Sequence, residues 1–262
     1  MIERLASGFE VAYDRAGSGV PLLLIHGWPH SRALWAGQTS GLATQALCIA
    51  PDLRGFGESE VSGPWSIDQF ADDLDALLGA LSIPNAVVCG LSMGGYVALS
   101  LLRRHPERVR GLVLASTRAT ADSLEAREKR ARLIEFIEQH GMEALATRQL
   151  SAMVGTTTLE SRPDVRTSLL EMMAAAPPAG VIGALRAMAG RADSSDLLPT
   201  ITVPTLVVGG AEDTFIPSDE LRAMAAGIPH SRFELLAGSG HVCAYECPGA
   251  FNHVVGEFLR GV

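Results

Sequence analysis

The sequence lacks the features that mark several large classes of protein. Four cysteines in 262 residues are too few for a disulfide scaffold. Lys129 is the only lysine among 21 basic residues, and a net charge of −8 argues against a nucleic-acid-binding surface. No apolar run approaches membrane-spanning length, and the N-terminus lacks the pattern of a signal peptide. We therefore expect a cytoplasmic protein that binds neither nucleic acid nor membrane.

Metal-ligand and nucleotide-binding patterns are equally scarce. Cys243 and Cys247 have a C-x3-C spacing with His241 nearby, but no second pair of ligands occurs elsewhere in the chain. The glycine-rich segment 90–95 lacks the lysine of a phosphate-binding loop. We interpret the other glycine-rich loop, 51–59, as structural, with an internal ion pair between Asp52 and Arg54. We therefore expect no metal and no organic cofactor.

The stretch 87–99, VVCGLSMGGYVAL, is the most informative part of the chain. Its first three residues are typical of a buried strand, and its end begins a helical pattern, so Ser92 falls on a strand-to-helix turn. Such a turn strains the serine backbone by about 1–3 kcal/mol. Gly90 and Gly94 remove the Cβ atoms that would collide there, and the N–H of Met93 faces the same space. With 27 glycines a G-x-S-x-G can occur by chance, but the strand before it and the helix after it favour a nucleophile.

Strand-like and helical segments alternate along most of the chain. This alternation predicts an α/β fold with a mostly parallel sheet covered by helices on both faces. Between 118 and 191 no strand-like run occurs, and three prolines divide a helical pattern. We interpret 118–191 as a helical insertion in a single core formed by 1–117 and 192–262. The predicted strands lie near 20–25, 47–50, 87–89, 109–115, 205–210 and 232–236, with two edge strands near 2–6 and 10–14.

Three polar residues follow predicted parallel strands, whose carboxyl ends meet at one edge of a sheet. They are Ser92, Asp213 and His241, in the order expected when a nucleophile on a turn precedes its acid and its base. A serine hydroxyl needs a base to become nucleophilic, an imidazole can take its proton, and a carboxylate orients that imidazole. Glu212 is the alternative acid. We interpret the other histidines as core, helix-end or surface residues.

An oxyanion hole needs two N–H donors. Met93 supplies one, and the chain just after Gly27 supplies the other, most simply through the N–H of Trp28. In the alternative interpretation, His26 and Gly27 only end a strand, with a buried histidine that holds the neighbouring loops. The two roles are compatible, because the donor belongs to the backbone.

Together these motifs resemble the α/β-hydrolase superfamily over essentially the whole chain. The resemblance implies an eight-stranded sheet, a helical lid after strand six, and a serine hydrolase that needs no cofactor. Within the superfamily the chain is most similar to bacterial carboxylesterases, 3-oxoadipate enol-lactonases and cofactor-free haloperoxidase or perhydrolase-type esterases. Haloalkane dehalogenases and epoxide hydrolases carry aspartate where Ser92 stands, which argues against their chemistry. The residues that carry the resemblance are HGWP at 26–29, DLRGFGES at 52–59, GLSMGG at 90–95, the Asp213 loop and Gly240-His241.

We expect a carboxylesterase that hydrolyses a small ester or lactone, with enol-lactonase or perhydrolase activity and a ligand-binding receptor as alternatives. Trp28 and Pro29 are expected in the substrate pocket. Family members with perhydrolase activity resemble this chain in carrying a proline at position 29; the alternative interpretation is that Pro29 only stiffens the loop. The sequence is compatible with a homo-oligomer but does not predict one. Methionines of the insertion provide adaptable apolar side chains for the same pocket, which we expect to include Met142, Met153 and Met172, with Met173 and Met188 as further candidates.

Overall fold

The computed structural model describes all residues, 1–262. The strands are β1 (Ile2–Arg4), β2 (Glu10–Gly17), β3 (Val20–Ile25), β4 (Ala46–Pro51), β5 (Ala86–Leu91), β6 (Val109–Ala115), β7 (Thr205–Gly210) and β8 (Arg232–Leu236). The α-helices are α1 (Ala36–Gly41), α2 (Ile67–Ala80), α3 (Met93–Arg104), α4 (Leu124–Met153), α5 (Thr156–Ser161), α6 (Pro163–Ala174), α7 (Pro178–Ala189), α8 (Ser218–Ala226), α9 (Cys243–Glu246) and α10 (Pro248–Leu259). Three 3-10 turns complete the set at Arg32–Trp35, Pro106–Arg108 and Leu198–Thr200.

All eight strands form one sheet in the order β1-β2-β4-β3-β5-β6-β7-β8. Only the β1–β2 and β2–β4 pairs are antiparallel; from β4 to β8 every pair is parallel. The predicted fold, an eight-stranded and mostly parallel sheet with helices, is confirmed. Because the six parallel strands run the same way, their carboxyl ends share one edge, where loops from β3, β5, β7 and β8 can meet.

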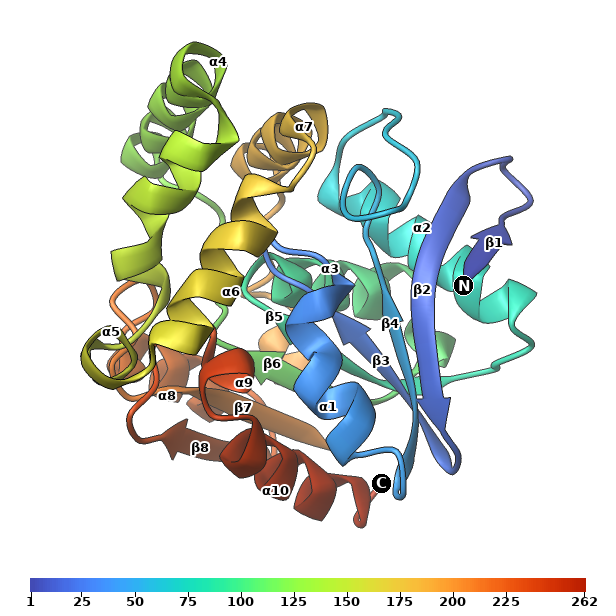
Figure 1. The fold of residues 1–262 in the computed structure, drawn as a ribbon. Helices are drawn as coiled ribbons and strands as arrows, with labels where there is room; N and C mark the ends of the chain where they lie inside the picture. Colours follow the sequence, from blue (N-terminus) through green and yellow to red (C-terminus); the bar gives the residue numbers. More distant parts are fainter.

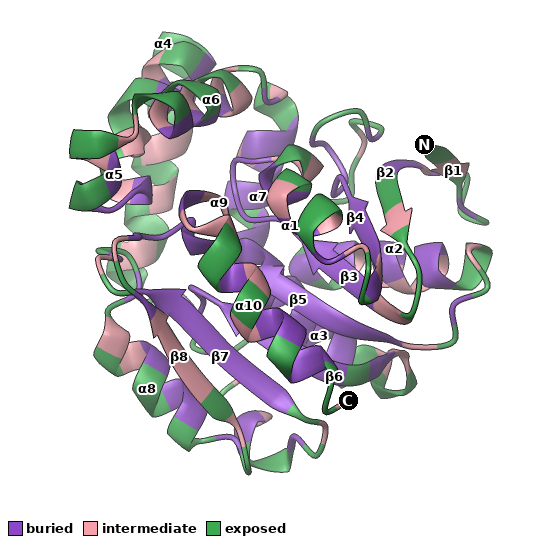
Figure 2. Cartoon of the chain, turned by 60° about the horizontal axis from the view of Figure 1, so that its bottom comes forward, coloured by how far each residue is buried: buried purple, intermediate pink, exposed green.

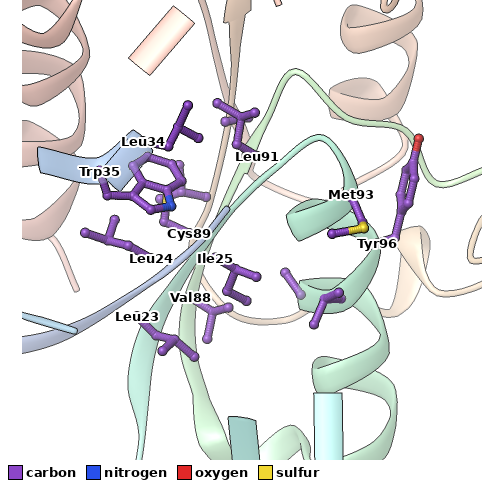
Figure 3. Packing of buried hydrophobic residues seen from close by; sticks show 14 of the residues in the cluster. Leu23, Leu24, Ile25, Leu34, Trp35, Val88, Cys89, Leu91, Met93 and Tyr96 are labelled. Carbon is purple, nitrogen blue, oxygen red and sulfur yellow. The ribbon is translucent and has the colours of Figure 1, made fainter. Parts of the chain in front are cut away.

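Helices cover the sheet on both faces (Figure 1). Helix α1 packs against α10 on one face, and α2 packs against α3, which lies on β5, on the other. β5 and β7 are buried throughout their length (Figure 2), which explains why Thr205 is the only polar residue in the two strands. Figure 3 shows Trp35 among Leu24, Leu34 and Cys89 in this core, where its side chain is fully buried.

The segment between β6 and β7 contains α4 to α7 and no strand. Pro163 and Pro178 are the first residues of α6 and α7, where a proline needs no N–H partner. Gly141, with φ of 78°, interrupts α4 and divides it into two halves. No single helix combines the length and the apolar character that a membrane crossing needs; α6 and α7 satisfy the composition only as a pair bent by 92°.

The predicted ion pair inside loop 51–59 is wrong. Arg54 donates to both carboxylate oxygens of Asp73 on α2, at 2.8 and 2.7 Å, and its guanidinium stacks on Phe9. The Asp52 carboxylate pairs with Arg32 instead and accepts the N–H of Glu58 at 2.9 Å. The two side chains of the loop therefore hold it to different parts of the core, which proximity in sequence does not reveal.

Candidate active site

Ser92 lies between β5 and α3 in a conformation that few residues other than glycine adopt. Its φ is 55° and its ψ is −114°, and its N–H donates to the carbonyl of Ala115 at 2.9 Å. Glycines on both sides permit the close packing. A Cβ on Gly90 would lie 2.2 Å from the Gly94 carbonyl oxygen, and one on Gly94 would lie 2.2 Å from that of Ile25. The local sequence thus lifts the Ser92 hydroxyl out of the sheet, while the rest of the turn stays buried.

The three residues predicted to act together lie in one hydrogen-bonded row. His241 Nε2 is 2.8 Å from Ser92 Oγ, and His241 Nδ1 is 2.9 Å from Asp213 Oδ2. A carboxylate only accepts, so Nδ1 carries the proton that it donates to Asp213, and Nε2 is left to accept the Ser92 hydroxyl. That tautomer is the one in which an imidazole can remove the serine proton.

The loop after β7 holds Asp213 in its ionised form. Its Oδ1 accepts the N–H groups of Phe215 and Ile216 at 2.8 and 3.0 Å, while its Oδ2 faces His241. Burial opposes ionisation, but the interaction with His241 and these N–H groups together hold the pKa of Asp213 below its usual value. The ring of Phe215 also packs edge-on against the imidazole, with 5.0 Å between centroids. Glu212, the alternative acid, instead accepts from Thr157.

Two backbone N–H groups beside Ser92 have no hydrogen-bond partner within the chain. They belong to Met93, the first residue of α3, and to Trp28, in the loop after β3. The two segments touch, since a Cβ on Gly27 would lie 3.2 Å from that of Ser92. His26 is fully buried below them, and its Nε2 accepts the N–H of Leu53 at 3.0 Å. Both roles proposed for this segment are therefore present: His26 is a buried histidine that holds the neighbouring loop, and the N–H of Trp28 is free.

Glu246, which belongs to none of the predicted motifs, fixes the loop that carries His241. Its side chain is fully buried, with one oxygen accepting the N–H of Gly240 and the other that of Gly155, each at 2.8 Å. Burial raises the pKa of the Glu246 carboxyl, against the effect of these two donors. One carboxylate thus joins the His241 loop to the start of α5. A glutamate five residues after the histidine is the only local signal of this role.

We expect Glu246→Gln to lower both stability and turnover. A glutamine presents an NH₂ group to one of the two N–H donors, and leaving a buried donor unsatisfied costs about 1–3 kcal/mol. The loop would then hold His241 less firmly, so kcat should fall more than KM changes. Urea unfolding and steady-state kinetics measure the two effects, with Glu257→Gln on the exposed side of α10 as the control. Equal stability of wild type and Glu246→Gln would contradict this role.

A cavity of about 550 Å³ opens above Ser92 and His241. Trp28, Met153 and Met188 line it, as does the apolar side chain of Phe215. Pro29, Met142 and Met172 do not belong to the lining, and Met173 is fully buried in the core. The indole N–H of Trp28 donates to the carbonyl of Val181 on α7 at 3.1 Å and thereby links the loop after β3 to the insertion. The other lining residues are Tyr96, Arg118, Asp122, Ala126, Lys129, Arg130, Arg132, Leu133, Arg148, Gln149, Thr214 and Ile216.

The side chains of Cys243 and Cys247 contact groups other than His241. Cys243 Sγ lies 3.7 Å from Ser116 Oγ, and Cys247 Sγ faces the carbonyls of the loop after β8. Both nitrogens of His241 are already engaged in the row with Ser92 and Asp213. A second group of potential metal ligands consists of Asp75, His105 and Glu107, whose ligand atoms lie within 4.8 Å of one another. The Asp75 carboxylate of this group already pairs with Arg108.

Comparison with known proteins identifies the family of the chain. The family model for the alpha/beta hydrolase fold matches residues 20–246. The chain belongs to this family. It is 32% identical to 3-oxoadipate enol-lactonase 2 of Acinetobacter baylyi over 87% of this chain and 84% of that protein.

Two solved structures are similar over their full length. A thermophilic esterase from Thermogutta terrifontis, with malate bound, superposes with a TM-score of 0.96 at 38% identity, covering 100% of this chain and 98% of the esterase. The enol-lactonase from Burkholderia xenovorans LB400 superposes with a TM-score of 0.91 at 28% identity, covering 99% and 100%. These relatives support hydrolase activity for this alpha/beta hydrolase.

Proposed function

We propose that this alpha/beta hydrolase is a serine hydrolase that cleaves carboxylic esters or lactones through an acyl-enzyme on Ser92. The observation that carries the proposal is the hydrogen-bonded row from Asp213 through His241 to the Ser92 hydroxyl. The nearby free N–H groups of Met93 and Trp28 support it. Esterases and enol-lactonases among the similar proteins support the same substrate class.

In the first half-reaction Ser92 Oγ attacks the substrate carbonyl carbon while its proton passes to His241 Nε2. The carbonyl oxygen becomes an oxyanion, which the N–H groups of Met93 and Trp28 stabilise. When the tetrahedral intermediate collapses, the bond to the alkoxy oxygen breaks and that oxygen takes the proton from His241. With a simple ester the alcohol leaves; with a lactone the ring opens and the hydroxyl stays on the acyl chain.

In the second half-reaction a water molecule replaces the alcohol. His241 removes its proton as the water oxygen attacks the acyl carbon, and the proton returns to Ser92 Oγ as the bond to the acyl group breaks. Asp213 stays ionised throughout and stabilises the imidazolium that forms in each step. The products are a carboxylic acid and the free enzyme.

Covalent labelling combined with turnover tests the proposal. A fluorophosphonate probe should add one equivalent to the protein, and peptide mass spectrometry should place it on Ser92. The same preparation should hydrolyse many equivalents of p-nitrophenyl butyrate. Labelling of another residue would overturn the assignment of Ser92. Acylation without repeated turnover would instead indicate a ligand-binding receptor on the same fold.

A further inference from the structure

The lining of the cavity above Ser92 carries more basic than acidic side chains, in a protein whose net charge is −8. Asp122 is the only acidic side chain in its lining. Opposed to it are five basic side chains, Arg118, Lys129, Arg130, Arg132 and Arg148. An excess of positive charge around a cavity raises the local concentration of anions at its opening.

The interruption of α4 at Gly141 brings these charges together. Lys129 and Arg132 lie in the first half of the helix, whereas Arg148 lies in the second, and all three line the same cavity. The guanidinium of Arg148 stacks on the ring of Phe136, 4.5 Å from its centroid, so the second half returns beside the first. The stacking holds the Arg148 side chain in place without neutralising its charge.

Arg148 is the basic residue of the lining that has no carboxylate partner. Arg130 donates to Asp122, and Arg118 pairs with Glu220 at 3.0 Å. Lys129 and Arg132 pair only with the glutamates one turn before them, Glu125 and Glu128, on exposed sides of the helix. Such exposed pairs contribute little, about 0–1 kcal/mol, and exchange easily for a ligand.

From this arrangement we infer that the enzyme selects substrates bearing a carboxylate on the acyl chain, which pairs with Arg148. The inference rests on the proposed function and narrows its substrate class to anionic esters and lactones. A guanidinium binds a carboxylate through two parallel N–H groups, and Arg148 is exposed and free to do so. Lys129 and Arg132 add to the field that draws the anion into the cavity.

Paired chromogenic esters test the selection. Mono-p-nitrophenyl glutarate and p-nitrophenyl valerate share a leaving group and acyl length, and differ by a terminal carboxylate in place of a methyl group. We expect kcat/KM of the wild type to favour the glutarate ester by about tenfold. Arg148→Gln should lower that ratio by about tenfold, chiefly through KM, and Arg148→Lys should retain part of it. The ratio should also fall between 0.1 and 1 M salt, as the screening length shortens from about 10 to about 3 Å.

Arg127→Gln provides a matched control. Arg127 lies on the same helix, is exposed and has no ion-pair partner, but it does not line the cavity. Its substitution removes the same charge and should leave the ratio unchanged. A wild-type ratio near one would overturn the inference. So would equal effects of Arg127→Gln and Arg148→Gln, which would indicate a general charge effect and no subsite.

A binding measurement separates this inference from the proposed function. Calorimetry with Ser92→Ala protein should show monoethyl glutarate binding about tenfold more tightly than ethyl valerate, and Arg148→Gln in that background should remove the difference. Failure of all ester turnover, with this binding preference intact, would reject the proposed function and keep the anion subsite. Equal binding of the two esters would reject the subsite even if turnover is rapid.

Discussion

Replacing Ser92 with alanine should abolish ester hydrolysis while leaving the protein folded. Apart from its backbone, Ser92 is held only by the hydrogen bond from Oγ to His241 Nε2, so the substitution removes one partly exposed contact. We expect kcat to fall by about 10⁴–10⁶-fold, since the oxyanion donors and the cavity would still act on the substrate. Steady-state hydrolysis of p-nitrophenyl butyrate measures the loss, and circular dichroism checks the fold.

The same experiment with His241 tests whether the row acts as one unit. His241→Ala should cost about as much as Ser92→Ala, and the double variant should be hardly worse than either, because each loss disables the same step. Ser100→Ala is the matched control. Ser100 lies on α3, the helix that follows Ser92. Its hydroxyl donates to Asp68 at 2.6 Å, outside the cavity above Ser92. Turnover near the wild-type rate in purified Ser92→Ala protein would rule out the mechanism.

The sequence was sufficient for the fold and for the residues that local signals identify. Ser92 is marked by the strand before it, the helix after it and the glycines beside it, all within a dozen residues. Asp213 and His241 each follow an apolar strand, and parallel strands necessarily end at the same edge. Their proximity is therefore a consequence of topology, which the alternation of strands and helices already predicts.

The positions that could not be predicted are those set by how segments distant in sequence pack against one another. The helical pattern of the insertion gives an apolar face but not its orientation, so the lining includes Met153 but not Met142 or Met172. An amphipathic pattern that ends at Gly141 marks the break in α4, but it does not show that the second half returns beside the first and places Arg148 in the cavity. For the same reason the partner of Arg54 lies on α2, although Asp52 is nearer along the chain.

Replacing Gly94 with alanine should destabilise the protein strongly. The added Cβ would lie 2.2 Å from the carbonyl oxygen of Ile25 and 2.9 Å from that of His26. Both oxygens belong to the backbone of a central strand and its end, which cannot move aside as a flexible side chain could. Overpacking in a well-packed core costs about 1–3 kcal/mol, and sometimes more, so we expect a loss near or above the upper limit.

The same substitution should reduce catalysis beyond its effect on stability. Pushing α3 away from the end of β3 separates the Met93 N–H from the Trp28 N–H, and loss of one oxyanion donor costs about 10²–10³-fold in kcat. Gly249→Ala is the matched control, because Gly249 lies in the first turn of α10 with nothing within 4 Å of an added Cβ. In an exposed helix that change should be neutral or stabilise by up to about 1 kcal/mol. Urea unfolding and kcat for both variants provide the comparison. If Gly94→Ala proved as stable and active as Gly249→Ala, close packing between β3 and α3 would not be what sets the oxyanion geometry.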